Sequence, residues 1–429
     1  MSSAVPFAEL VRDGVVTPGY GPSERVDPYW GVVWSSASDG GPVLAWRSLE
    51  SEHALRDASI RIPSRPGGRR HTRTQDEALD LLGRRRARLI TLGTVNLWRT
   101  LTSQQIYAIT GRPGVASSVS DEASLLFDAG LIQRGRFHYA GRALDSMPEV
   151  FRPATHTDKI DLRQHLRYAD WVGVTLGGPS IKGHLYDRHN LITTELSLRT
   201  AEMCPLRSVL GESAATWPRL FPSRLTPNPY RSADAVWVRE DGLKIAIELT
   251  ATVTVPTIKK IDQLADLLAR DTTKSTVVLF VLAPRPGQDH ELDVGRRLRQ
   301  AIKRASHSSR SRVIAEVSDR LLIATWKSWF PVPGLVSREF VRLRAQRYAA
   351  ADDEWVDTDL LDPYDVLFSG AGSHEVEQTS TNLNSVLGAP WWMRTGPGFD
   401  FDNFLLQKAG FDRALAIKAA TDRDRRKGQ

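Results

Sequence analysis

The chain has a single cysteine, Cys204, among 429 residues. One cysteine excludes an internal disulfide framework and a cysteine-based zinc site, and it is typical of a reducing compartment. No apolar run comes near the roughly 18 residues that a membrane-spanning helix needs. The first residues, MSSAVPFAELVRDG, also lack the basic start and apolar core of a signal peptide. We therefore expect a cytoplasmic protein with no membrane partner.

Several catalytic motifs are missing as well. The sequence has no glycine-rich phosphate loop of the Walker type, no His-Glu-x-x-His and no nucleophile elbow. The histidines are scattered, and His184 and His189 are too poorly spaced to share one helical face. These absences argue against P-loop nucleotide hydrolysis, zinc-dependent proteolysis and serine-hydrolase chemistry.

The charge balance is positive. Lys and Arg number 57 against 50 Asp and Glu, which gives a formal net charge of +7. A basic balance favours a polyanionic partner, and nucleic acid is the leading candidate, although a solvated basic surface is the plain alternative. With 41% hydrophobic and 25% charged residues, the composition is that of a globular protein long enough for two or three domains.

Residues 75–145 have the order of a winged helix. Leucines repeat near helical period after residue 75, a second helix is expected to begin at Leu101-Thr102-Ser103, and a third is expected over 117–129. The pieces LIQRGRF and HYAG then read as two short strands joined at Arg134-Gly135-Arg136. Three helices followed by a hairpin favour a winged-helix domain that reads double-stranded DNA.

In such a domain the third helix enters the major groove and the hairpin touches the phosphate backbone. The basic run GRRRAR, one helix earlier, favours DNA over a protein partner, although a winged helix used for protein contacts stays open. The candidate DNA-binding residues are Ser117, Ser118 and Ser120 of the helix, Arg134, Arg136 and His138 of the hairpin, and Arg84, Arg85 and Arg86.

Residues 155–330 alternate helical and extended patterns, with a possible further strand before Asp234. The expected order is α-β-β-α-β-α-β, a mixed sheet covered by helices. The expected elements are a helix at about 190–203, strands at 235–239 and 243–250, a helix at about 256–270, a strand at 275–284, a helix at about 291–305 and a strand at about 320–326.

The two ends of the chain, residues 1–70 and 335–429, have weaker sequence patterns than the middle. Residues 1–70 suggest a β-rich arm or small domain, with short strands at 30–34 and 43–46 and an Arg/Pro/Gly-rich linker at 62–70. Residues 335–429 suggest a helical extension with irregular loops. The predicted fold class is α/β (α+β), with a winged-helix domain followed by a restriction-endonuclease-like mixed sheet flanked by helices.

The segment SADAVWVREDGLKIAIELT holds the most informative residues. Alternation along a strand places Glu248 on the same face as Lys244 and Thr250. Asp234 begins the preceding strand and is the natural neighbour of Glu248. Two close carboxylates repel each other and favour a divalent cation, so the pair is a candidate Mg²⁺ or Mn²⁺ site.

This pair resembles the PD-(D/E)xK nuclease superfamily, in which an Asp is followed at some distance by Glu-x-Lys. Asp234 and Glu248 match the pattern, whereas Thr250 stands at the lysine position. The resemblance implies that a lysine elsewhere orients the attacking water. Lys259 on the following helix is the preferred candidate and Lys260 the fallback. Gln263 shares a helical face with Lys259.

The resemblance also implies a further carboxylate from an earlier helix, and Glu195 is the candidate, with a solvated helix residue as the alternative. Residues 80–285 together resemble the replication-relaxation family of plasmids and other mobile elements. The shared motifs are AGLIQR, the His189-Asn190-Leu191 entry to a helix, and SADAV…IELT.

That family implies DNA binding in plasmid replication or mobilisation, with other replication or mobilisation proteins as further partners. Two functions follow as hypotheses. One is a Mg²⁺-dependent DNA endonuclease or nickase. The other is a non-catalytic DNA-binding regulator or assembly protein with a degenerate nuclease fold. The sequence leaves open whether the protein forms a homo-oligomer.

Overall fold

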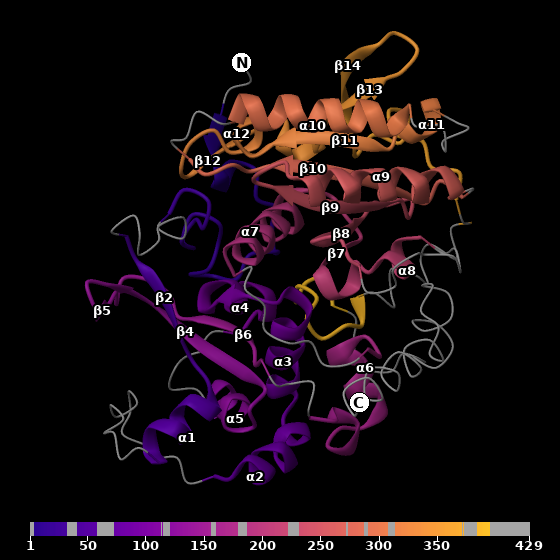
Figure 1. Ribbon diagram of the computed structural model, residues 1–429. Coiled ribbons are helices and arrows are strands. Elements are labelled where there is room, and N and C mark those ends of the chain that lie inside the picture. Colours follow the sequence, from indigo (N-terminus) through magenta and orange to yellow (C-terminus); the bar gives the residue numbers. More distant parts are fainter. Residues whose placement is uncertain are drawn as a thin grey trace. The chain divides into compact units, whose positions relative to one another are not determined.

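The chain divides into two compact units, both drawn in Figure 1. Unit 1 comprises the described residues within 4–15 and 199–372, and unit 2 those within 16–198 and 384–394. The computed structural model describes residues 4–31, 41–57, 73–112, 114, 121–155, 160–178, 187–221, 231–271, 273–286, 291–307, 314–370, 372 and 384–394. Both units mix helices and strands, as the predicted α/β (α+β) class requires.

Unit 1 is built on a seven-stranded sheet in the order β14-β13-β11-β10-β9-β8-β7. Strands β9, β10 and β11 are parallel, and the remaining neighbours are antiparallel. The strands are β7 (Ser208–Gly211), β8 (Ala235–Val238), β9 (Lys244–Thr250), β10 (Thr276–Leu282), β11 (Leu321–Thr325), β13 (Arg344–Ala349) and β14 (Glu354–Asp359). A separate pair joins β1 (Ala4–Pro6) to β12 (Leu335–Ser337).

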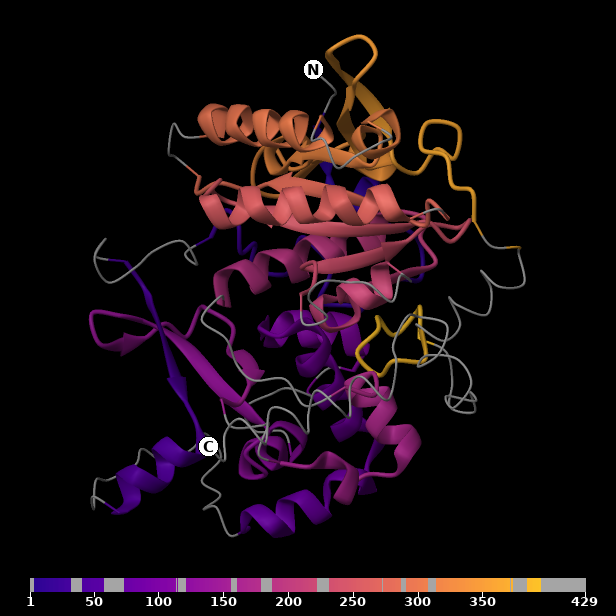
Figure 2. The ribbon, with the colours of Figure 1, turned by 45° about the vertical axis from the view of Figure 1, so that its right-hand side comes forward.

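Helices α9 and α10 lie side by side along one face of this sheet (Figures 1 and 2). They connect the parallel strands β9, β10 and β11, as crossover helices must. Every residue of β10 is buried, which agrees with its uninterrupted apolar sequence. The helices of unit 1 are α8 (Trp217–Leu220), α9 (Val255–Arg270), α10 (Glu291–Ser306), α11 (Ile314–Ser318) and α12 (Trp326–Trp329), and α7 (Asp187–Met203) ends in it.

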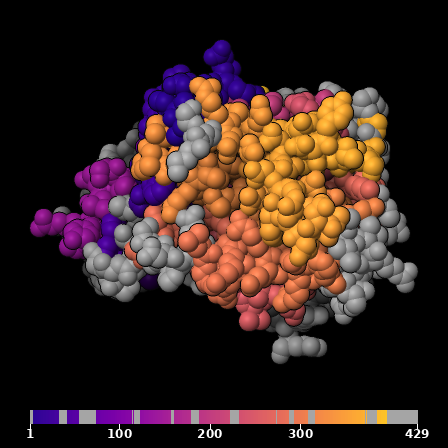
Figure 3. All heavy atoms as spheres, turned by 90° about the horizontal axis from the view of Figure 1, so that it is seen from above, coloured from indigo at the N-terminus to yellow at the C-terminus, as the bar shows by residue number. Residues whose placement is uncertain are grey.

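The elements expected between 190 and 326 lie within a few residues of their predicted bounds, and β7 is the additional strand before Asp234. The helical extension expected from residue 335 is wrong for the part that the structure describes. Residues 335–359 form β12, β13 and β14, and β13 extends the sheet beyond β11. Seen from above, segments that follow β11 cover much of the visible face (Figure 3).

Unit 2 has a helical core and a small antiparallel sheet in the order β2-β4-β6-β3, with β5 paired to β4. Helix α4 begins at a capping box in which Thr102 and Gln105 bond reciprocally, and it ends at left-handed Gly111. The elements are β2 (Val43–Arg47), α1 (Leu49–Asp57), α2 (Gln75–Asp80), α3 (Arg86–Trp98), β3 (Leu101–Thr102), α4 (Ser103–Thr110), α5 (Asp121–Asp128), β4 (Ile132–Tyr139), β5 (Arg142–Ala143), β6 (Val150–Pro153) and α6 (Tyr168–Thr175).

Two local expectations in unit 2 are wrong. Strand β4 runs unbroken through Arg134-Gly135-Arg136, where a turn was expected, and the chain turns instead at Ala140 and Gly141, which both have positive φ. Trp30 lies in a turn rather than in a strand. Strand β2 does form where 43–46 was expected to be extended, while residues 32–34 and the linker at 62–70 lie outside the described residues.

Residues 384–394, named the strap below, pack against the helices of unit 2. The amide of Leu387 donates to the carbonyl of Gly173, and the indole of Trp98 donates to the carbonyl of Gly388. Gly388 lies so close to α3 that an added Cβ would be 2.6 Å from the carbonyl oxygen of Gly93. The strap therefore depends on a backbone-to-backbone approach that only glycine permits.

We predict that Gly388→Ala destabilises the protein by about 1–3 kcal/mol, because the new methyl group must displace α3 or the strap. Gly372→Ala is the matched control, since a Cβ there would meet nothing within 4 Å. The measurement is urea unfolding of both variants beside the wild type. Equal unfolding midpoints for the two variants would contradict the close packing of the strap.

Candidate active site

The register between β8 and β9 brings two carboxylates together. Ala235 is opposite Ile247 in this antiparallel pair, and the amide of Asp234 donates to the carbonyl of Ile247 at 2.8 Å. Asp234 stands just before β8, and Glu248 follows Ile247 on β9. The carboxylates of both residues act on the ammonium of Lys260, so the two acidic side chains lie near one point.

A hydrogen bond fixes the orientation of the first carboxylate. Oδ2 of Asp234 accepts from the backbone amide of Leu249 at 2.7 Å. Glu248 is buried, with 5% of its surface exposed. A buried carboxylate requires compensation by a cation or by hydrogen-bond donors.

Lys260 of α9 supplies a cation to this site. Its Nζ lies 2.6 Å from Oε2 of Glu248, and its side chain is about a quarter exposed, at 26%. Burial acts to lower the pKa of Lys260, but the carboxylates of Glu248, Asp234 and Glu212 outweigh it, so the pKa is raised. Lys260 is therefore held as a charged ammonium among three acidic groups.

Glu212 was not a candidate in the sequence, yet it belongs to this site. It directly follows β7, whose last residue Gly211 is opposite Ala235, and its carboxylate contributes to the raised pKa of Lys260. The hydroxyl of Ser232 donates to Oε1 of Glu212 at 3.0 Å. A carboxylate at the end of a strand is the sequence feature that could have indicated Glu212. It points to this site only when β7 is recognised as a strand next to β8.

Arg231 is the second residue that the sequence did not indicate. Its Nη1 donates to Oε1 of Gln263 on α9, and its guanidinium lies 5.4 Å from the ring centroid of Trp217. Gln263 lies on the same helix as Lys260, and its amide oxygen accepts the hydrogen bond from Arg231. This contact places a second positive charge beside α9.

The other candidate lysines have different surroundings. Lys259 is exposed, so the structure places the fallback residue Lys260, rather than Lys259, beside Glu248. Lys244 donates to the carbonyls of Arg219 and Leu220 at the opposite end of β9, and burial lowers its pKa to about 8. Thr250 is buried and carries no charge into the site.

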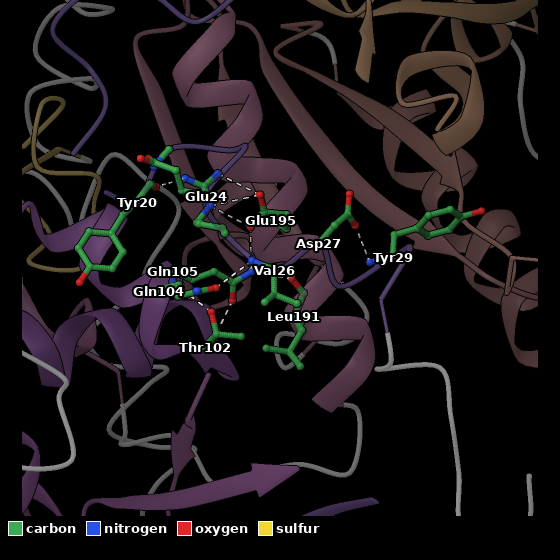
Figure 4. A network of polar contacts seen from close by, with 12 residues as sticks. Tyr20, Glu24, Val26, Asp27, Tyr29, Thr102, Gln104, Gln105, Leu191 and Glu195 are labelled. Atoms are coloured by element: carbon green, nitrogen blue, oxygen red, sulfur yellow. Dashed lines mark hydrogen bonds and ion pairs between the residues drawn. The ribbon is translucent and has the colours of Figure 1, made fainter. Parts of the chain in front are cut away.

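Glu195 has a structural partner in unit 2. Its side chain is fully buried and pairs with Arg25, whose Nη2 lies 2.9 Å from Oε1. Gln105 of α4 donates to Oε2 of Glu195 at 3.2 Å and to the carbonyl of Leu191 at 3.1 Å (Figure 4). The expectation that Glu195 adds a metal ligand is therefore not supported by its contacts, which explain its burial instead.

The donor set decides which metal could fit. In the part of the chain that the structure describes, no group of three or more His, Cys, Asp or Glu side chains is arranged to hold a metal ion. Asp234 and Glu248 offer two carboxylates. Mg²⁺ is commonly held by one or two carboxylates with water and substrate phosphates completing its coordination, so the residues fit Mg²⁺ better than a metal that needs an all-protein cage.

The DNA-binding candidates are distributed unevenly. Arg84, Arg85 and Arg86 are exposed around the start of α3, and Arg86 lies 3.3 Å from Asp170. Arg136 is exposed and His138 partly exposed on β4. The candidates Ser117, Ser118 and Ser120 lie outside the described residues.

Arg134 differs from these exposed residues. It is 9% exposed, and its Nη2 donates to Oε1 of Glu149 at 2.7 Å. This guanidinium is thus committed to a neighbouring strand segment, and the expectation that it reaches phosphate from a turn is wrong.

Comparison with known proteins identified no relative. The chain matches no protein-family model, no curated protein and no solved structure. None of the described helices is both long enough and apolar enough to cross a membrane.

We predict that Glu195→Gln lowers the free energy of unfolding by about 3–5 kcal/mol, because it leaves the buried guanidinium of Arg25 without its counter-charge. Asp262→Asn is the control, since its partner Arg304 is exposed and such surface pairs contribute about 0–1 kcal/mol. Chemical unfolding measures both changes. A Glu195→Gln variant as stable as the control would contradict the structural role of this ion pair.

Proposed function

We propose that the protein binds double-stranded DNA and cleaves or nicks it with Mg²⁺ at the site formed by Asp234, Glu248 and Lys260. The observation that carries the proposal is the meeting of two strand-borne carboxylates with one lysine from the next helix. A PD-(D/E)xK nuclease needs these three groups, and Lys260 supplies the ammonium that Thr250 cannot. A role in the replication or mobilisation of a plasmid or other mobile element is part of the same proposal.

Unit 2 supports the DNA-binding half of this proposal. Helices α3, α4 and α5 are followed by β4 and β6, and the short β3 pairs with β6. This order and pairing resembles that of a winged helix, with β4, β5 and β6 in the place of the wing, and the resemblance supports the proposal. The exposed Arg84, Arg85 and Arg86 supply positive charge for phosphate contacts.

In a catalytic mechanism, Asp234 and Glu248 would hold the metal and Lys260 would position the nucleophile. When bound, Mg²⁺ supplies Lewis acidity toward a phosphate oxygen and lowers the pKa of a bound water. The Asp234 carboxylate is already oriented by the Leu249 amide. The raised pKa of Lys260 means that it serves as a fixed positive charge rather than as a base.

One observation favours a second function, a DNA-binding regulator without catalysis. The ammonium of Lys260 is bonded directly to Glu248 and already compensates that buried carboxylate. This ion pair compensates the charge of Glu248 without any metal. A nuclease fold with such a pair can lose catalysis and keep only its DNA-binding role. The two functions make opposite predictions for cleavage and the same prediction for DNA binding.

We predict that the wild-type protein nicks supercoiled plasmid DNA with Mg²⁺ or Mn²⁺ and that EDTA abolishes the reaction. Asp234→Asn and Glu248→Gln should each lower the rate at least about a hundredfold, since each removes a metal ligand or its charge. Lys260→Met should lower the rate to a similar degree, because the fixed positive charge is lost. Conversion of supercoiled to open-circular plasmid on agarose gels is the measurement.

Lys259→Met is the matched control for Lys260→Met, since the two lysines are adjacent and only Lys260 contacts Glu248. The control should retain the wild-type rate. A folded wild type that binds DNA but never nicks it would support the regulator instead. Equal loss in both lysine variants would argue against the assignment of Lys260.

A further inference from the structure

The strap completes a cluster of three arginines next to α4. The guanidinium of Arg394, in the strap, donates from Nη2 to the carbonyl of Ile109 at 3.2 Å and to that of Ala389 at 3.0 Å. The amide of Trp391 donates to the same Ile109 carbonyl at 2.8 Å. Arg394 is thereby held at the C-terminal end of α4. Its partner Ile109 is three residues before Arg112, which is exposed.

The start of α3 contributes the third arginine. Burial, followed by the charges of Arg86 and Arg112, lowers the pKa of Arg394 to about 10, so both of these guanidinium groups act on that of Arg394. Asp170 is the acidic side chain that pairs with Arg86, and no described carboxylate pairs with Arg112 or Arg394. Like charges held together cost free energy unless an anion joins them.

The cluster is anchored at the end of α4. Arg112 directly follows the Gly111 cap of α4, whose backbone is packed so tightly that an added Cβ would be 2.5 Å from the ring of Trp391. Along the described side chains of α5, only Glu122 and Ser124 are partly exposed, and all others are buried. Helix α5 itself carries no basic side chain, so positive charge for phosphate contacts in unit 2 has to come from other elements such as this cluster.

We propose that Arg86, Arg112 and Arg394 form a phosphate-binding cluster that grips the backbone of duplex DNA, with the strap as an integral part of the DNA-binding surface. The proposal rests on the DNA-binding half of the proposed function and is independent of cleavage. Guanidinium groups suit phosphate because they present several donors in a planar fork. Arg394 is fixed by two backbone carbonyls, so it offers its charge without ordering a mobile side chain.

The test is a salt titration of binding to a short duplex, followed by fluorescence anisotropy. Arg112→Gln, at an exposed position whose loss should not affect folding, is expected to weaken binding several-fold at low salt. It should also reduce the slope of log affinity against log salt by about 0.9, the value for one phosphate contact. The double variant Arg86→Gln/Arg112→Gln should lose about twice that slope.

Arg297→Gln is the control, because Arg297 is an exposed arginine of α10 in unit 1 and its loss changes the net charge equally. It should bind like the wild type. If the wild type binds duplex with a steep salt slope and the Arg112 variants match it, the cluster is wrong and the DNA-binding function stands. If the wild type has no duplex affinity at low salt, the DNA-binding function itself fails.

Discussion

The register between β8 and β9 is the constraint on which the candidate site depends. It is set by the tight turn that joins the strands, where Arg239 and Leu243 are bonded through their backbones and Gly242 takes a positive φ of 94°. The buried guanidinium of Arg239 pairs with Asp241 in the same turn. A slip of one residue would turn the Glu248 side chain to the other face of the sheet, away from Lys260. Turn chemistry at one end of the strands thus determines acid placement at the other.

Charge balance at the site follows from that register. Three acidic residues on neighbouring strand ends act on a single lysine, whose ammonium remains protonated because their attraction exceeds the cost of burial. Lys260 is not the only group that compensates these acids. The amide of Leu249 donates to Asp234 and the hydroxyl of Ser232 donates to Glu212, while Arg231 bonds to Gln263 on the same helix as Lys260.

The sequence predicted much of unit 1 because its signals are local. Apolar strands, a turn at Glu240-Asp241-Gly242 and a strongly amphipathic α9 fix bounds to within a few residues. Gly135 was interpreted as part of a turn for the same local reason. In the structure it lies within β4 opposite Trp46 of β2, and an added Cβ would lie 3.0 Å from the Trp46 ring. Lys259 and Lys260 point about 100° apart around the helix axis. Which of them faces Glu248 depends on how α9 packs on the sheet, and sequence spacing does not determine that. Contacts such as Arg25 with Glu195 join residues far apart in the chain, so no local pattern could indicate them.

A net charge of +7 says nothing about where the positive charge is concentrated, and the structure separates two cases. On α10, basic side chains are largely balanced by neighbours, as Arg296 is by Asp293 and Arg304 by Asp262. At the α4 end of unit 2, Arg86, Arg112 and Arg394 come from three distant segments, and only Arg86 has an acidic partner among the described residues, Asp170. The first arrangement balances its charge locally, whereas the second concentrates positive charge that the described neighbours do not balance.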